Sequence, residues 1–192
     1  MEANHHNANS HTHNGSEVKL EPSPFPCMFT VELYDQRIPE STQLQRVYMI
    51  RPQQIWLSME RFAEIRVGNE AFQPHDTVVL SNVNRSPSRE SIARILEIRA
   101  KDEDHVYLRV YYLRPAVEVA PIYTLLSQSN SIITQEQRSR ELVATNELGV
   151  VDASQVEGGA LVTRLSSNGR ENIPPKGFWW RWMYDVATGQ VS

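Results

Sequence analysis

Cysteine, lysine and long apolar runs are scarce in this chain of 192 residues, and each scarcity excludes a class of protein. Cys27 is the only cysteine, so neither an intrachain disulfide nor a cysteine-based zinc site can form. No apolar run approaches the roughly 20 residues that span a bilayer, and the N-terminus lacks the basic-then-apolar order of a secretory signal. We therefore expect an intracellular, soluble protein without membrane contact.

Catalytic motifs are also missing. The chain contains no G-x-S-x-G, Walker A, G-x-G-x-x-G or H-E-x-x-H pattern. Outside the N-terminal tail the only histidines are His75 and His105. Each adjoins a turn, where a solvated histidine is more common than a catalytic base. The acidic run 102–104 lacks the spaced ligands and the glycine of a calcium loop. We expect no enzymatic activity, no cofactor and no metal site.

The net charge of the chain disfavours nucleic-acid binding through bulk electrostatics. The net charge is −4 and the pI is about 5.9, and only three of the 19 cationic residues are lysines. The arginine bias favours bidentate and stacking contacts at an interaction surface. A local cationic excess leaves DNA contact open as an alternative: Arg85, Arg89, Arg94, Arg99 and Lys101 outnumber Glu90 and Glu97. We expect direct DNA binding to be weak or absent.

Composition divides the chain into three parts. Residues 1–26 form a His-, Asn- and Pro-rich tail that cannot bury enough apolar surface to order, so we expect disorder rather than a histidine metal site. Val18-Lys19-Leu20-Glu21 in this tail matches the apolar-Lys-x-Glu pattern that SUMO-conjugating enzymes read, but four-residue patterns recur by chance and a passive linker is the favoured interpretation. Residues 27–54 are expected to be an extension that packs on the core. The main domain then covers 55–190, with a polar insertion at about 116–140.

Short apolar alternations predict an all-β chain. About eight strands are expected, including 77–80, 91–99 and 105–114, with a short helix or turn at 53–62. No sustained helical stripe or internal repeat occurs. The expected fold is a twisted antiparallel β-barrel or sandwich with long loops and few short helices.

Alternation along two strands predicts which side chains are buried. We expect one face to form the core, with mostly buried Val106, Leu108, Val110, Tyr112, Phe178, Trp180 and Trp182. Trp179, Arg181 and Met183 are expected on the other face of the last strand. The opposite face of the middle strand is aromatic and basic, as is typical of a binding groove: Tyr107, Arg109, Tyr111 and Leu113.

Five segments in a fixed order carry a family resemblance: H-D-T-V-V-L (75–80), S-I-A-R-I-L-E-I (91–98), V-Y-L-R-V-Y-Y-L-R-P (106–115), E-L-V-A-T-N-E-L-G-V-V-D-A-S-Q-V-E-G (141–158) and F-W-W-R-W-M-Y (178–184). Together they resemble the bromo-adjacent homology (BAH) domain. The stretch 56–72 resembles the fungal branch, and the C-terminal stretch is similar to BAH domains that run into a PHD finger.

The resemblance implies a twisted β-barrel in a nuclear, chromatin-associated interaction module. Its partner would be a histone tail, a nucleosome or another chromatin protein, in transcriptional regulation or silencing. The alternative is a non-histone protein–protein adaptor that keeps the fold without recognising methyl-lysine.

Departures from the family pattern bear on the expected site. The three aromatic cage positions of methyl-lysine readers correspond to Ser91, Tyr111 and Leu113, and a peptide-contacting histidine corresponds to Glu147. Because one ring contributes only about 0.5–1 kcal/mol of cation–π energy at a partly exposed site, we expect at most a severalfold preference for trimethyl-lysine. The candidate peptide-binding residues are Tyr107, Arg109, Tyr111, Ser91, Leu113 and Glu147.

Overall fold

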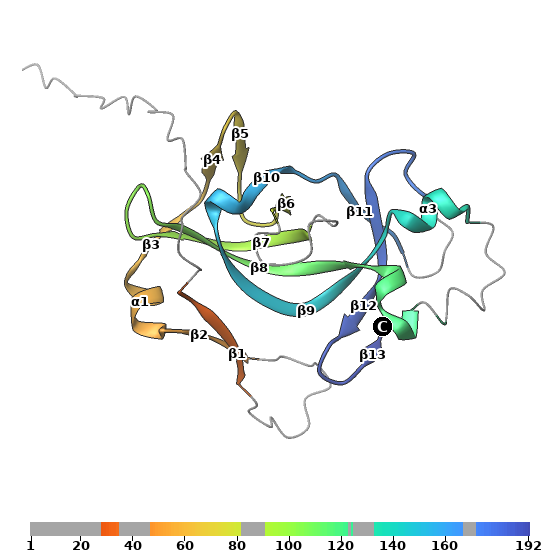
Figure 1. The fold of residues 1–192 in the computed structure, drawn as a ribbon, viewed down its shortest axis with the longest axis horizontal. Coiled ribbons are helices and arrows are strands. Elements are labelled where there is room, and N and C mark those ends of the chain that lie inside the picture. Colours follow the sequence, from red (N-terminus) through yellow and green to blue (C-terminus); the bar gives the residue numbers. More distant parts are fainter. Residues whose placement is uncertain (1–27, 35–46, 82–90, 123, 125–132, 167–171) are drawn as a thin grey trace, which may run out of the picture.

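The structure is a computed structural model that describes residues 28–34, 47–81, 91–122, 124, 133–166 and 172–192 (Figure 1). The histidine-rich tail, Cys27, the Lys19 motif and the loop with Arg85 and Arg89 lie outside the described residues. Within the described part, the chain is mainly β with a few short helices, as the alternation of apolar residues predicts.

One large sheet contains most of the strands. Its order is β10-β6-β7-β8-β9-β12-β11, with β13 paired to β12 and β3 paired to β7. The strands are β3 (Glu60–Phe62), β6 (Thr77–Leu80), β7 (Ser91–Ala100), β8 (Val106–Pro115), β9 (Glu141–Asp152), β10 (Val156–Gly159), β11 (Val162–Arg164), β12 (Phe178–Asp185) and β13 (Gln190–Val191). The predictions of strands at 91–99 and 105–114 are confirmed by β7 and β8.

The sheet curls until its two edges meet through one stretch of chain. β10 and β11 lie at opposite ends of the strand order, yet only Ala160 and Leu161 separate them. The Ala160 N–H donates to the Thr77 carbonyl at 2.8 Å, and the Phe178 N–H donates to the Leu161 carbonyl at 2.8 Å. The result is a barrel-like body crossed by the long strands β7, β8 and β9 (Figure 1). β12 runs parallel to β9 and β11, which alternation along the sequence does not reveal.

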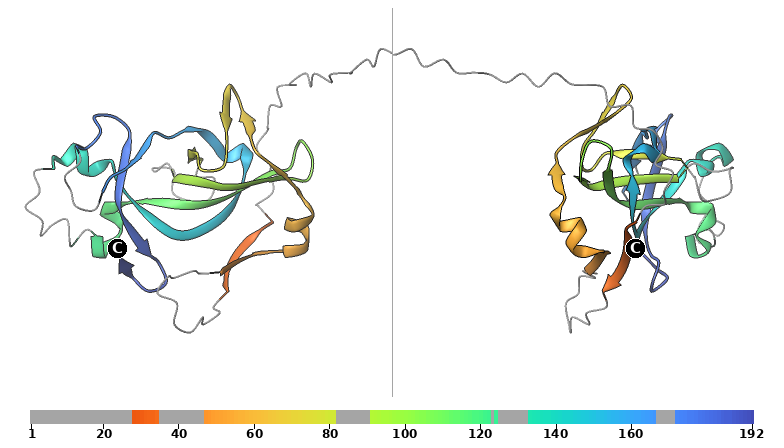
Figure 2. Two further views of the ribbon diagram at one scale, coloured as in Figure 1. Left: turned by 180° about the vertical axis from the view of Figure 1, so that it is seen from behind. Right: turned by 60° about the vertical axis from the view of Figure 1, so that its left-hand side comes forward.

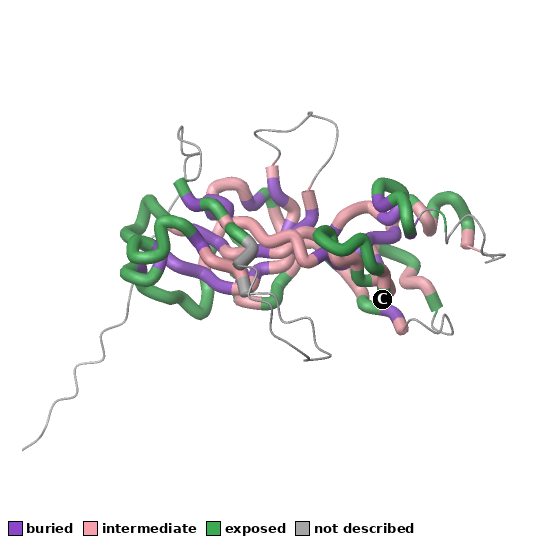
Figure 3. The backbone as a smooth tube through the Cα atoms, turned by 90° about the horizontal axis from the view of Figure 1, so that it is seen from below, coloured by how far each residue is buried: buried purple, intermediate pink, exposed green. Residues whose placement is uncertain are grey.

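The concave side of the sheet holds the main core. Its buried residues are Phe72, Val78, Leu80, Ala93, Ile95, Ile98, Leu108, Val110, Val151, Ala153 and Val156. Leu108 and Val110 are buried as predicted, whereas Val106 and Tyr112 pack against this cluster with part of their surface exposed. Buried segments follow the central strands, and exposed segments follow the outer turns (Figure 3).

The last long strand is covered on both sides. Trp180 packs in a cluster with Ile92 and Leu113, as expected of a core residue. Trp179 is fully buried at 0% exposure, so the face of β12 opposite to Trp180 is covered as well. The Trp179 indole N–H donates to the Gln137 carbonyl at 3.2 Å, and the Arg181 guanidinium lies 4.6 Å from the Trp179 ring centroid. A bulge follows in the strand: Trp180 lies opposite Leu142, but Trp182 lies opposite Val143.

Because Arg181 is the extra residue of that bulge, Trp182 turns away from the face of Trp180. Trp182 packs instead against the buried cluster of Ala116, Val119, Ile122 and Val143. The expectation that Trp180 and Trp182 share one face is therefore wrong. Phe178 is partly buried beside the Trp180 cluster.

The N-terminal hairpin and the first helix cover one end of the convex side. The hairpin consists of β1 (Thr30–Tyr34) and β2 (Val47–Arg51), and α1 (Gln53–Ser58) follows it. Phe29, Ile50, Trp56 and Met59 pack against Tyr107 and Val150 of the sheet. The Phe29 ring meets the rings of Trp56 and Tyr107 edge-on, with centroids 5.4 and 5.0 Å apart. Figure 2 shows this hairpin and α1 at the opposite end of the body from α3 (Gln135–Ser139).

The remaining elements are short. A separate hairpin, β4 (Ile65–Val67) and β5 (Glu70–Phe72), projects beside the barrel, and η1 (Ala116–Glu118) and η2 (Ala153–Gln155) follow β8 and β9. The helix α3 begins with a capping box between Thr134 and Gln137. Among the described helices, none is long and apolar enough to cross a membrane.

Removal of a buried tryptophan ring should unfold a domain of ordinary stability. Trp179→Ala and Trp180→Ala should each lower the free energy of unfolding by about 3–5 kcal/mol, because each leaves a large cavity. Met183→Ala, on the same strand but half exposed, should change it by less than about 1 kcal/mol. Chemical denaturation measures all three, and a stable Trp179→Ala variant would contradict the burial on both sides of β12.

Candidate functional site

The convex face of β8 is covered at both ends and open between them. Tyr107 is 9% exposed beneath Phe29, and Leu113 is 4% exposed against Leu142 and Trp180. Arg109 and Tyr111 lie between these two covers and are only partly buried. The convex face of β8 is therefore least covered at these two residues.

Two neighbouring strands add residues to this gap. Tyr111 lies opposite Arg94 of β7 on one side and Leu148 of β9 on the other, and all three are partly buried. Directly opposed residues of antiparallel strands project from the same face. We refer to Arg94, Arg109, Tyr111 and Leu148 as the open strip.

Four of the six candidate peptide-binding residues lie outside the open strip: Tyr107, Leu113, Ser91 and Glu147. Tyr107 and Leu113 share the face of Tyr111, but the N-terminal elements and the Trp180 cluster bury them. Ser91 lies opposite Leu80, two residues before Ala93, and both of these side chains belong to the concave core. The register therefore places Ser91 on the opposite face from Tyr111, and the expected juxtaposition is wrong.

Glu147 is engaged by an arginine. A bulge in β9 separates Leu148, opposite Tyr111, from Ala144, opposite Leu113. Both oxygens of the Glu147 carboxylate in this bulge accept from Arg114: Oε2 from Nε at 3.0 Å and from Nη2 at 2.6 Å, and Oε1 from Nη2 at 2.7 Å. This bidentate pair neutralises Glu147, so its charge is already compensated before any basic peptide arrives.

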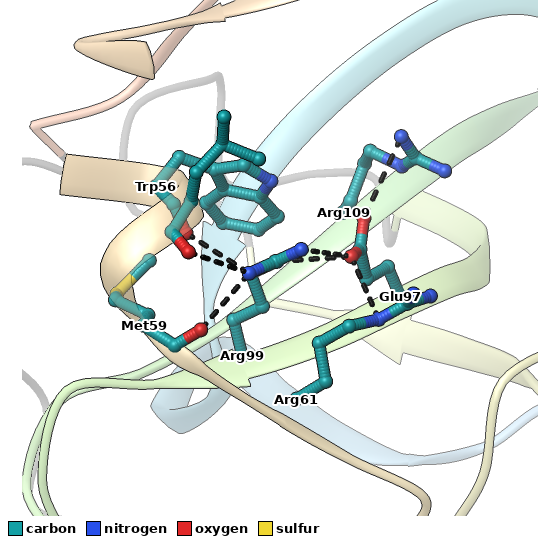
Figure 4. A network of polar contacts seen from close by, with 7 residues as sticks. Trp56, Met59, Arg61, Glu97, Arg99 and Arg109 are labelled. Atoms are coloured by element: carbon teal, nitrogen blue, oxygen red, sulfur yellow. Dashed lines mark hydrogen bonds and ion pairs between the residues drawn. The ribbon is translucent and has the colours of Figure 1, made fainter. Parts of the chain in front are cut away.

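A buried carboxylate at the end of the open strip gathers three arginines. The Glu97 side chain is 7% exposed, and its Oε1 lies 2.8 Å from Arg99 Nη2 and 3.0 Å from Arg61 Nε. Its Oε2 lies 3.5 Å from Arg109 Nη1. Figure 4 shows Arg61 and Arg109 approaching the carboxylate from opposite sides. One negative charge thus faces three positive ones.

Arg99 uses its remaining donors to hold the end of α1. Its Nη1 donates to the carbonyl oxygens of Trp56, Leu57 and Met59 at 3.2, 3.4 and 2.9 Å. Its guanidinium also lies 5.5 Å from the Trp56 ring centroid. A cation at a helix C-terminus satisfies carbonyls that have no partner within the helix. Arg99 therefore connects α1 to β7. The sequence places Arg99 among the cations that could contact DNA, but its buried guanidinium cannot reach a phosphate.

Sequence reasoning missed Arg61, Glu97 and Arg99 as site residues. A signal existed for two of them, because Glu97 and Arg99 stand two residues apart in the mainly apolar stretch 95–100 and must share a face. Arg61 lies opposite Arg99 through the β3–β7 pairing, which the sequence does not disclose.

A second buried carboxylate lies at the other end of the body. Glu141 is fully buried, and neither of its oxygens has a hydrogen bond. Burial raises the pKa of Glu141 to about 7, although Arg181, Arg138 and the Trp182 indole oppose the increase. Arg181 Nε lies 3.4 Å from Oε1, and its guanidinium stacks 4.6 Å from the Trp179 ring centroid.

The two histidines outside the tail occupy turns. His75 adopts a φ of 82°, and its N–H donates to the Ile95 carbonyl at 2.7 Å. His105 Nδ1 lies 2.5 Å from the Asp102 carboxylate in the exposed β7–β8 turn. Within the described ranges, no three His, Cys, Asp or Glu side chains are grouped so that they could hold a metal ion.

Loss of the Arg99 guanidinium should be costly. Arg99→Ala should lower the free energy of unfolding by about 3–5 kcal/mol, because it removes the most buried of the three arginines at Glu97 and the donor to the Trp56, Leu57 and Met59 carbonyls. Arg66→Ala, on the exposed β4–β5 hairpin, serves as the control and should have little effect. Equal urea midpoints for the two variants would contradict a stabilising connection between α1 and β7 through Arg99.

Glu141 should make stability fall as pH rises. Its folded-state pKa of about 7 exceeds its ordinary 4.5, so folding favours the protonated form. That stabilisation is complete below pH 4.5 and is lost as pH rises through 7, by about 3 kcal/mol in total. Glu141→Gln should flatten the free energy of unfolding across this range, whereas the exposed Glu157→Gln should not. A Glu141→Gln profile parallel to the wild type would contradict the burial.

Comparison with known proteins supports the fold alone. No family model matches the chain, and no curated protein matches it. Among solved structures, the crystal structure of the yeast Rsc2 BAH domain is similar with a TM-score of 0.50 and 15% sequence identity. The match covers 69% of this chain and 54% of that chain, so it spans about half of the solved structure. The chain thus has a BAH-like fold.

Proposed function

We propose that this chain is a chromatin-associated protein-interaction module that acts in the nucleus, and that its contact surface is the open strip. The observation that carries this proposal is the partly exposed Tyr111 on a BAH-like sheet whose flanking positions, Tyr107 and Leu113, are sealed. An extended segment crossing β8 there would meet an aromatic ring and arginine donors rather than a closed surface.

A histone tail or nucleosome is the first partner to test, in transcriptional regulation or silencing. Tyr111 supplies one aromatic wall for a lysine side chain. With Ser91 assigned to the concave face and Leu113 buried, the strip offers no second wall at the two other cage positions. Recognition would therefore depend on backbone and side-chain contacts along the strip more than on methylation.

The charge of the strip favours a second candidate, a non-histone adaptor. Arg94 and Arg109 flank Tyr111, whereas the nearest carboxylates, Glu97 and Glu147, already face arginines. A basic histone tail would meet repulsion at this end of the strip, and an acidic partner would not.

The Tyr111→Ala variant tests whether the open strip is the contact surface. Binding of the full chain to reconstituted mononucleosomes and to histone-tail peptides should weaken severalfold, because one stacked ring is lost from the contact. Met183→Ala, also exposed but on β12, should bind like the wild type. Unchanged binding in Tyr111→Ala would move the contact away from the strip.

Methylation should matter little to the same interaction. Calorimetry with matched peptides should give at most a severalfold preference for trimethyl-lysine over lysine, the contribution of one ring. Ser91→Tyr should not increase the preference, because the new ring would project from the other face. A hundredfold preference in the wild type would show that a cage exists elsewhere.

A further inference from the structure

The Glu97 cluster leaves two arginines without a carboxylate of their own. Arg99 contacts Oε1 of Glu97 through both Nε, at 2.9 Å, and Nη2, at 2.8 Å. Arg99 is therefore the main counterion of the Glu97 carboxylate. Arg61 and Arg109 each lie within 4 Å of Glu97 and of no other carboxylate among the described residues. Three guanidinium groups thus share one buried anion.

Both of these arginines remain accessible. The Arg61 side chain is 69% exposed and the Arg109 side chain is 37% exposed. Each guanidinium is anchored to Glu97 through one nitrogen, which leaves its other N–H donors for a ligand. Arg109 Nε is buried and has no hydrogen-bond partner. Two cations held on opposite oxygens of one carboxylate are already oriented, so a ligand that joins them loses less side-chain entropy.

We propose that Arg61 and Arg109 form a binding site for the carboxylate side chains of an acidic protein segment. This inference rests on the proposed function insofar as Arg109 belongs to the open strip, and it specifies the chemistry of the segment that enters at the β3 end. A planar guanidinium matches a carboxylate in bidentate geometry, and two neighbouring guanidiniums match successive acidic residues of an extended chain.

Exposed apolar side chains on the neighbouring helix α1 favour a protein ligand over nucleic acid. Ile55 and Leu57 of α1 are 42% and 58% exposed. The Leu57 carbonyl accepts from the same Arg99 that binds Glu97, which places α1 beside the arginines. The whole chain carries a net charge of −4, which disfavours a polyanion that spreads charge over a wide surface. Mixed acidic and apolar side chains fit this corner better.

Fluorescence anisotropy on the full chain tests the site. The probe is a labelled peptide of Glu and Phe separated by Gly and Ser, and its control replaces every Glu by Gln. The wild type should bind the Glu peptide about tenfold more tightly than the Gln peptide, and added salt should reduce the difference. Equal binding of the two peptides by the wild type would overturn the proposal.

Charge-matched double variants locate the contact. Arg61→Gln with Arg109→Gln should abolish the preference for the Glu peptide, whereas Arg66→Gln with Lys176→Gln should retain it. Arg61→Gln alone should reduce the preference severalfold, and its side chain is exposed enough to leave folding intact. An undiminished preference in the Arg61 and Arg109 variants would overturn the assignment.

Duplex DNA in the same assay distinguishes carboxylate from phosphate recognition. DNA binding that depends on Arg61 and Arg109, with no binding of the Glu peptide, would assign the pair to phosphate and overturn this inference. Failure of this site is distinguishable from failure of the proposed function. If only this site fails, the Arg61 and Arg109 variants bind the Glu peptide like the wild type, while Tyr111→Ala still weakens nucleosome binding.

Discussion

The Arg99 guanidinium is nearly buried, so its donors must be satisfied within the protein. It meets this requirement through Glu97 and through three carbonyl oxygens at the end of α1. Because Glu97 and Arg99 stand on β7 and the carbonyls belong to 56–59, the cluster fixes the N-terminal elements on the sheet. Those elements bury Tyr107, and that burial sets one boundary of the open strip. The same carboxylate also orients Arg61 and Arg109, so one charged group serves both the fold and the proposed site.

Coverage of both sheet faces decides where a partner can bind. The concave side is filled by the main core, and the convex side is covered at one end by the N-terminal hairpin and α1 and at the other by Trp180 and its neighbours. The strip between the two covers is short, and its middle is Tyr111. Its positive charge comes from Arg94 and Arg109, and Arg109 shares the Glu97 carboxylate with Arg61 and Arg99. A BAH-like scaffold can therefore present a cationic rather than a cage-like surface.

The mainly β fold and the long strands β7 and β8 follow from the sequence, because apolar alternation and polar turns are local signals. The bulges at Leu96, Arg181 and 145–147 are not local signals, and each one changes which side chains share a face. The bulge at Arg181 explains why Trp182 leaves the face of Trp180. The candidate site was predicted in part: Arg109 and Tyr111 lie together in an open position, but Ser91 depends on a cross-strand register that no single sequence displays. Arg61 joins the cluster only through the pairing of β3 with β7.

Hydrogen exchange of the arginine Nε–H groups, measured by nitrogen-15 NMR on the full chain, tests the Arg99 cluster most directly. The Arg99 Nε–H should exchange far more slowly than the Nε–H of exposed Arg66, because it is buried and donates to Glu97 at 2.9 Å. Glu97→Gln should accelerate its exchange, since the charged acceptor is lost. Exchange of the Arg99 Nε–H at the rate of the Arg66 Nε–H in the wild type would contradict a buried Arg99 that connects α1 to the sheet.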